Sequence, residues 1–224
     1  MWRTLLVLAA FFALLSTSGF AAPPQPSAAT VVVLDRPGQP TARITDGDTV
    51  RLRLVLSSPV SGSQSYTFKL DNLGLAVGTC DIVAASSCET DPAPSLGWHW
   101  DPGGLPRQVR VVSAYDAQGA RVARSGPLAV LPRPVVMVHG FISAWNTWKP
   151  YLGPDGFLAP LGIRGFAVGD GQVPGVMNTG VITDPAGATN TIAQNAAIEG
   201  QYIAAVKKAT GADLVISKEV GTFA

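Results

Sequence analysis

The chain has few of the residues on which most catalytic and metal sites depend. Its 224 residues include only two histidines, His99 and His139, and two cysteines, Cys80 and Cys88. Two cysteines this close together, with no second pair and so few histidines, do not make a zinc site. We therefore expect neither a metal nor another cofactor, and few residues are available to serve as a catalytic base.

Charged residues are also scarce. They make up 14% of the chain, and 16 basic residues nearly balance 15 acidic ones, for a formal net charge of +1. This balance gives no case for a nucleic-acid partner or for an anionic membrane surface. Glycine and proline are abundant instead, with 24 and 18 residues, which is a turn-rich composition typical of exported β-rich proteins.

No apolar run is long enough to cross a bilayer. The longest, Leu5 to Leu15, has eleven residues, whereas a spanning helix needs about 20. Arg3 before it and small residues after it predict a signal peptide over residues 1–21, followed by a leader over 22–29; an uncleaved anchor is the alternative. We expect a secreted or periplasmic protein, in which a Cys80–Cys88 disulfide is favoured over two free thiols.

Residues 30–131 predict an all-β domain. Apolar and polar residues alternate with period two, as in Val50-Arg51-Leu52-Arg53-Leu54, and turn signals such as Asp46-Gly47-Asp48 separate the alternating segments. Six to eight short strands resemble an immunoglobulin-like β-sandwich in size and rhythm. Trp98-His99-Trp100 is either an exposed platform for a sugar or peptide or part of the edge of the core.

The periodicity changes after Pro132-Arg133-Pro134, which predicts a domain boundary and a second domain over 132–224. Short apolar segments predict buried strands, a 3.6-residue period predicts helices, and residues 170–190 form a polar loop. Alternating strands and helices imply right-handed crossovers and a parallel sheet. The predicted strands are 135–138, 164–168 and 212–216, and the predicted helices are 145–152 and 191–210.

Residues 133–216 resemble the opening of an α/β-hydrolase of the lipase and esterase kind. The resemblance rests on the apolar strand before His139-Gly140-Phe141, on segment 145–152, and on the long helix that leads to Ala212–Val215. It implies a fold in which the immunoglobulin-like sandwich precedes an incomplete α/β-hydrolase domain of about three parallel strands with flanking helices. It also implies carboxylic ester hydrolysis, with an ester or lipid as substrate.

The same resemblance implies that His139, Gly140 and Phe141 form the oxyanion loop. Ester cleavage places negative charge on the carbonyl oxygen, and a backbone N–H aimed at that oxygen lowers the barrier by ~3–4 kcal/mol. In the family one such donor follows this strand, which here is the N–H of Phe141. His139 then braces the loop and is not the catalytic base.

The nucleophile of the family is missing where the resemblance would place it. Its Gly-x-Ser-x-Gly elbow aligns with 217–221, where Glu219 replaces the serine, and no histidine follows to act as base. We therefore expect a chain truncated before its catalytic Ser, Asp and His and lacking ester hydrolase activity. A gene shortened by a frameshift or stop is favoured over a non-catalytic remnant. The alternative function is an exported binding protein that uses its β-sandwich.

Overall fold

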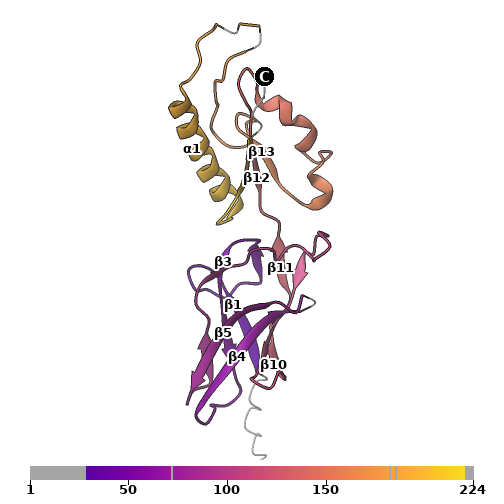
Figure 1. Ribbon diagram of the computed structural model, residues 1–224, viewed down its shortest axis with the longest axis vertical. Coiled ribbons are helices and arrows are strands. Elements are labelled where there is room, and N and C mark those ends of the chain that lie inside the picture. Colours follow the sequence, from indigo (N-terminus) through magenta and orange to yellow (C-terminus); the bar gives the residue numbers. More distant parts are fainter. Residues whose placement is uncertain (1–28, 72, 182, 185, 220–224) are drawn as a thin grey trace, which may run out of the picture.

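The computed structural model describes residues 29–219 except 72, 182 and 185. The predicted signal peptide, leader residues 22–28 and Gly221 lie outside these described residues. Two lobes follow one another along the long axis of the molecule (Figure 1): a β lobe, residues 30–131, and a C-terminal lobe, residues 132–219. None of the described helices is both long and apolar enough to cross a membrane.

The β lobe is built from eleven short strands joined by turns. Their bounds are β1 Thr30–Leu34, β2 Arg43–Thr45, β3 Thr49–Val55, β4 Ser63–Leu70, β5 Ala76–Val83, β6 Ser87–Glu89, β7 Ala93–Pro94, β8 Val109–Arg110, β9 Val112–Tyr115, β10 Arg121–Arg124 and β11 Leu128–Leu131. The predicted alternation is confirmed in β3, where Val50, Leu52 and Leu54 are buried between half-exposed neighbours. These strands therefore have one dry face, and the dry faces enclose a common core.

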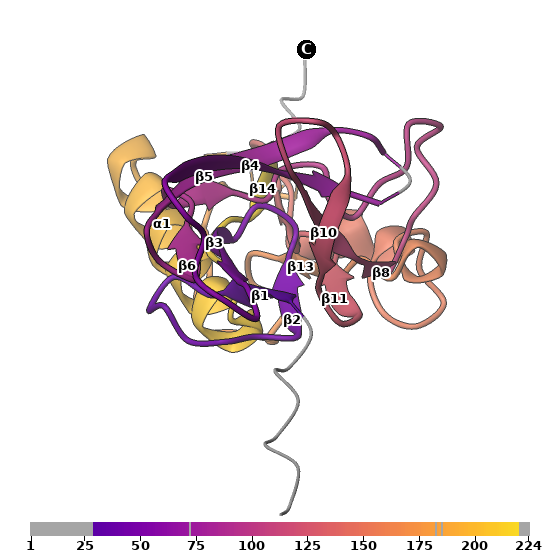
Figure 2. The ribbon, with the colours of Figure 1, turned by 90° about the horizontal axis from the view of Figure 1, so that it is seen from below.

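The predicted immunoglobulin-like sandwich is wrong, because the main sheet curls on itself. Its strand order is β5-β4-β9-β10-β1-β3-β6, with β7 also paired to β3, and β2-β11-β8 form a smaller separate sheet. A disulfide joins Cys80 in β5 to Cys88 in β6, the strands at the two ends of this order. The result is a nearly closed, barrel-like sheet (Figure 2). Period-two alternation identifies strands but does not tell which edges meet.

A buried arginine organises the loop between β7 and β8. The side chain of Arg110 is fully buried, and its guanidinium donates to the carbonyl oxygens of Trp98 and Trp100 at 2.6 and 2.8 Å and to Asp101 at 2.8 Å. Arg107 also binds Asp101, from a more exposed position. The hydrogen bonds from Arg107, which has the larger effect, and from Arg110 lower the pKa of Asp101 below its ordinary value. The loop is thus folded around one desolvated cation.

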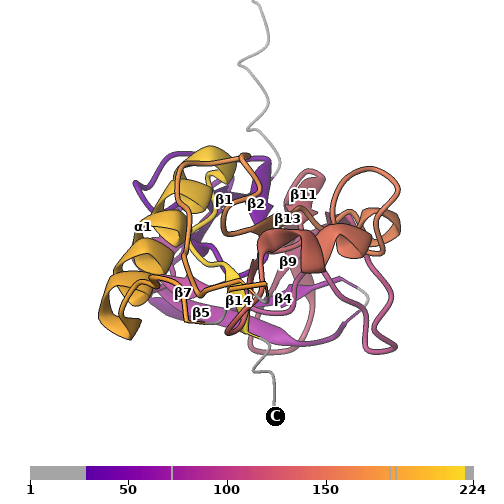
Figure 3. The same cartoon turned by 90° about the horizontal axis from the view of Figure 1, so that it is seen from above.

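The C-terminal lobe contains a sheet of three parallel strands. Its elements are β12 Val135–Val138, the 3₁₀ segments η1 Trp145–Tyr151 and η2 Ala159–Leu161, β13 Gly165–Ala167, α1 Ile192–Thr210 and β14 Ile216–Glu219. The central strand, β12, pairs in parallel with β13 and with β14. Val136 and Val138 pack towards Tyr202 and Val206 of α1, whereas Met137 packs against Trp148 of η1. Because side chains alternate along a strand, α1 and η1 cover opposite faces (Figure 3).

The predicted α/β-hydrolase domain is also wrong. Strands account for 35% of the structure and helices for 16%, and three short strands with one α-helix do not make the hydrolase pattern of parallel strands and flanking helices. Pro150 lies inside the segment predicted as a first helix, which is only a 3₁₀ turn. The third strand begins at Ile216 rather than Ala212, because residues 211–214 contact the β lobe instead.

The prediction of a long helix after Asn190 is confirmed. Thr191 and Gln194 form a reciprocal capping box at the start of α1, and Gly211 ends the helix with a φ of 74°. Only Tyr202 and Val206 of α1 are fully buried. The Tyr202 hydroxyl lies 2.8 Å from both the Ala167 carbonyl and the Asp170 carboxylate, and burial raises its pKa. Tyr202 therefore fixes α1 against the end of β13.

Removal of the disulfide between Cys80 of β5 and Cys88 of β6 should destabilise the barrel-like sheet. In the chain-entropy model a loop this short contributes about 2–3 kcal/mol to the free energy of unfolding. We therefore expect the double variant Cys80→Ser/Cys88→Ser to lose that much stability and to unfold at a lower urea concentration. Urea unfolding of the oxidised protein, the reduced protein and the double variant checks it. Equal midpoints for all three would show that β5 and β6 stay together without the bridge.

Replacement of Arg110 by methionine should destabilise the β lobe strongly. The change leaves the buried Trp98 carbonyl and the partly buried Trp100 carbonyl without their donor, and an unsatisfied buried acceptor costs about 1–3 kcal/mol. Arg107→Met is the matched control, because it touches the same Asp101 but no buried carbonyl. Urea unfolding should therefore give a much larger loss for Arg110→Met than for Arg107→Met, and similar losses would contradict the role given to the buried cation.

Candidate functional site

The sequence-predicted site residues lie at one edge of the three-stranded sheet. Because β12, β13 and β14 are parallel, their carboxyl ends point the same way, to the edge where ligands usually bind in such sheets. His139, Gly140 and Phe141 follow β12 directly. Glu219 is the last residue of β14, and its backbone pairs with Val138. The structure thus brings Glu219 beside the predicted oxyanion loop, but as a strand residue and not in a turn after the strand.

The imidazole of His139 is buried behind this loop. Its Nδ1 lies 3.3 Å from the hydroxyl of Thr179 and 3.4 Å from the carbonyl oxygen of Gly140. The Thr179 hydroxyl also lies 3.1 Å from the Ser143 carbonyl, to which it donates its single proton. It therefore accepts from His139, which assigns the Nδ1–H tautomer. Burial lowers the pKa of His139, against the opposing effect of the Gly140 carbonyl, so the ring is neutral at pH 7.

The backbone of the loop is strained at Ile142. This residue has a φ of 53°, in the left-handed region that a β-branched side chain rarely occupies, at a cost of about 1–3 kcal/mol. The strain is maintained from outside the loop, because the N–H of Ile142 donates to the Thr179 carbonyl at 3.0 Å. Thr179 thus holds the loop through both its backbone and its hydroxyl. Strained backbone held this way is common at ligand sites.

Phe141 presents its N–H next to the strained residue. None of the described residues accepts a hydrogen bond from this N–H, and the side chain is 64% exposed. Gly140 precedes it and carries no Cβ to crowd an approaching group. The loop can therefore offer a backbone donor to an oxyanion at the carboxyl end of β12.

The described residues supply no activated nucleophile at this edge. The Ser217 hydroxyl lies in the middle of β14 and donates to Glu199 of α1 at 2.9 Å, so it has no histidine beside it. The Thr179 hydroxyl contacts a histidine, but it accepts that proton and is not deprotonated by it. A hydroxyl of ordinary pKa needs a base to attack an ester.

Other candidate residues lie away from the strand ends. Cys80 and Cys88 are in the β lobe and form the disulfide. Trp98 and His99 are buried, and His99 Nδ1 donates to the Val130 carbonyl at 2.7 Å. The exposed aromatic platform considered for Trp98-His99-Trp100 is therefore not formed. Within residues 29–219, His, Cys, Asp and Glu side chains form no group of three or more that could hold a metal.

A cavity of about 230 Å³ lies at the junction of the two lobes rather than at the strand ends. Its acidic residues Asp35, Asp48 and Asp213 accept hydrogen bonds from backbone N–H groups. Since each of these carboxylates already takes part in the hydrogen bonding of the fold, we place the candidate site at the strand ends.

Sequence reasoning missed Thr179, which holds the loop. It lies in the polar segment 170–190, where no periodicity or motif marks it. Its role depends on a tertiary contact across forty residues, and the glycines and prolines around it indicated only that the segment was a loop. No protein-family model and no curated protein sequence matches this chain.

The lowered pKa of His139 predicts how stability should vary with pH. Unfolded histidine has a pKa of about 6.5, so between this value and the lower folded value the unfolded chain binds a proton that the folded protein does not. The free energy of unfolding should fall as pH drops through 6.5 and level off below the folded pKa of His139.

Chemical denaturation at a series of pH values measures this effect. The matched control is His139→Asn, which keeps a donor near the Nδ1 position but does not titrate. Burial raises the pKa of Asp48, which acts with the opposite sign in both proteins and cancels in the comparison. A wild-type profile that coincides with that of His139→Asn would contradict the buried, neutral imidazole.

Proposed function

We propose that residues 139–143 form an oxyanion-binding loop of the kind used by lipases and esterases, and that the function of this protein belongs to carboxylic ester chemistry. The observation that carries the proposal is the N–H of Phe141, which follows the central parallel strand and has no acceptor among the described residues. The strain at Ile142 and its hydrogen bond to Thr179 support it, because an oxyanion donor must be held in place before the charge develops.

The proposal gives each residue of the loop a distinct role. Phe141 donates its N–H to the oxyanion, and Gly140 allows the close approach. His139 braces the loop through Thr179 and is not assigned as the base, since its ring is buried and no hydroxyl among the described residues hydrogen-bonds to its Nε2. The ligand chemistry is that of a tetrahedral carbon bearing a negatively charged oxygen, which an ester forms on attack.

The described residues do not complete this chemistry. An ester hydrolase needs a nucleophile with a base within hydrogen-bond reach, and neither Ser217 nor Thr179 has one. We therefore propose that the 224-residue chain binds an oxyanion without turning over an ester. We further propose that it is exported, because the Cys80–Cys88 disulfide fits an oxidising, extracellular compartment.

A phosphonate monoester tests the oxyanion loop directly. Monoethyl butylphosphonate is a stable, non-covalent mimic of the tetrahedral oxyanion, and we expect its addition to shift the Phe141 amide signal downfield in a ¹H–¹⁵N correlation spectrum. Phe141→Pro removes the N–H and its signal, so the response is compared between variants at the neighbouring Gly140 and Ile142 amides. It should be lost there in Phe141→Pro and retained in Phe141→Ala, which keeps the N–H. Unchanged signals of the β lobe and of α1 verify that both lobes fold in both variants.

Equal responses of Phe141→Pro and Phe141→Ala would contradict the proposed donor. A companion assay with p-nitrophenyl butyrate should give no turnover above buffer. Turnover that disappears in Ser217→Ala or Glu219→Gln would show that a nucleophile is present after all and would overturn the non-catalytic part of the proposal.

A further inference from the structure

One turn of the β lobe lies where two strands of the C-terminal sheet begin. This junction turn, residues 45–49, connects β2 to β3 and contains Asp46-Gly47-Asp48. It contacts the segment that leads into β12 through Arg133 and the segment that leads into β14 through Asp213. The amino ends of β12 and β14 therefore lie against the same five residues.

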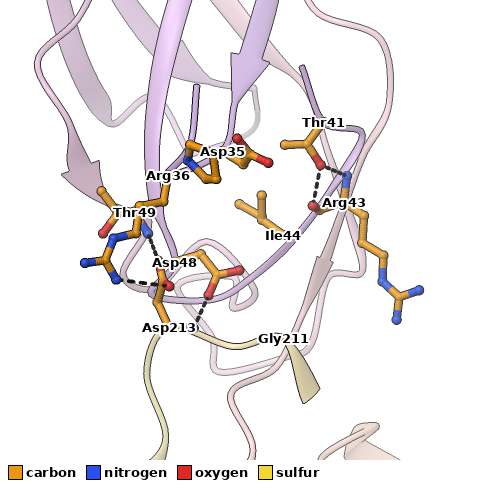
Figure 4. A pocket seen from close by; sticks show the side chains of 10 residues that line it. Asp35, Arg36, Thr41, Arg43, Ile44, Asp48, Thr49, Gly211 and Asp213 are labelled. Atoms are coloured by element: carbon orange, nitrogen blue, oxygen red, sulfur yellow. Dashed lines mark hydrogen bonds and ion pairs between the residues drawn. The ribbon is translucent and has the colours of Figure 1, made fainter. Parts of the chain in front are cut away.

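Two hydrogen bonds join the junction turn to Asp213, one to the Asp48 carboxylate and one from the Thr49 backbone (Figure 4). The N–H of Asp213 donates to the Asp48 carboxylate at 2.8 Å, and the N–H of Thr49 donates to the Asp213 carboxylate at 3.0 Å. Hydrogen bonds from N–H groups to carboxylates are among the stronger ones in proteins. Arg36 adds an ion pair to Asp213 at 3.7 Å, although its side chain is 74% exposed. Two well-formed hydrogen bonds thus join the lobes here.

Arg133 and Gly47 form the second half of the junction. The Nε of Arg133 lies 3.6 Å from the fully buried carboxylate of Asp46, so the two charges pair although the distance is too long for a hydrogen bond. Gly47 has a φ of 91°, and a Cβ built on it would lie only 3.1 Å from Leu214 and 3.2 Å from Arg133. The junction turn therefore contacts both incoming segments, at a position where only glycine fits.

The junction turn is itself fixed within the β lobe. The N–H of Asp46 donates to the Leu131 carbonyl at 2.7 Å, and the Asp46 carboxylate accepts from the N–H of Trp98. Ser95 donates to the Asp48 carbonyl from both its N–H and its hydroxyl. The turn presents its groups to the C-terminal lobe as a rigid surface and not as a mobile loop.

The pairing of β12 with β14 connects the junction turn to the candidate site. The pairing of β12 with β14 opens with the N–H of Ile216 donating to the Pro134 carbonyl, and it ends where Val138 pairs with Glu219. His139 follows immediately. A shift or detachment of β14 would remove the strand that pairs with Val138, the residue directly before the buried His139.

We infer that the junction turn of the β lobe positions the oxyanion loop, with Asp213 as the positioning residue that fixes the start of β14. The β lobe is then a scaffold that the C-terminal sheet requires, rather than an independent module. The inference depends on the proposed function only for what the loop binds; the mechanical coupling from Asp213 to His139 holds whatever the ligand.

Three variants of the full chain test the coupling. Asp213→Ala removes the acceptor for the Thr49 N–H, whereas Asp213→Asn keeps one acceptor and should rescue it. Arg36→Ala removes only the exposed ion pair. We expect hydrogen exchange of the Ile216–Lys218 amides to become roughly tenfold faster in Asp213→Ala and to stay near wild type in the other two. The amides of β4 and β5 serve as the internal reference.

The second readout is local to the candidate site. The chain has only two histidines, so each ring can be followed by proton NMR. In Asp213→Ala, displacement of the end of β12 and of the loop that follows it should expose His139 and raise its pKa toward the ordinary value of about 6.5. Asp213→Asn should titrate like the wild type. A merely structural loss of stability would not move the pKa of His139 alone.

Unchanged β14 exchange and an unchanged His139 titration in Asp213→Ala would overturn the inference. If that variant does not fold, native-state hydrogen exchange of the wild type is the test. The amides of Thr49, Asp213 and Ser217 should then exchange with the same opening free energy. Unequal opening free energies would overturn the inference. Neither readout uses the phosphonate or an ester. Failure of the coupling is therefore distinguishable from failure of the proposed oxyanion loop.

Discussion

The arrangement of the two lobes depends on the paired hydrogen bonds that join Asp213 to Asp48 and Thr49. A three-stranded parallel sheet with one α-helix has little core of its own, and small cores are marginal. Here the junction turn adds hydrogen bonds and an ion pair at the amino ends of two of the three strands. The barrel-like β lobe, closed by its disulfide, supplies the rigidity that the smaller lobe lacks.

This anchorage leaves the candidate site at the opposite edge of the sheet. Parallel strands that are held at their amino ends present their carboxyl ends away from the holder, and there β12 leads into His139, Gly140 and Phe141. Thr179 closes the loop from the other side and keeps Ile142 in a strained conformation. The loop is thus fixed from two directions, as a preorganised donor of hydrogen bonds must be.

Local patterns in the sequence predicted local structure well and its assembly poorly. The alternation in β3, the central strand Val135–Val138 and the capped helix after Asn190 were all readable, because each depends on neighbours within one element. The barrel-like closure, the late start of β14 and the role of Thr179 were not, because each depends on contacts between distant segments. The His-Gly-Phe signature suggested an incomplete α/β-hydrolase domain, and the structure does not show the hydrolase pattern of parallel strands with flanking helices.

The most direct test of this account is the detection of the two hydrogen bonds between the lobes. NMR scalar couplings across hydrogen bonds can be sought from the Thr49 nitrogen to the Asp213 carboxylate carbon and from the Asp213 nitrogen to that of Asp48. The bond from Thr45 to Asp48, within the β lobe, is the internal control. The account predicts all three couplings. Detection of the control alone would contradict it.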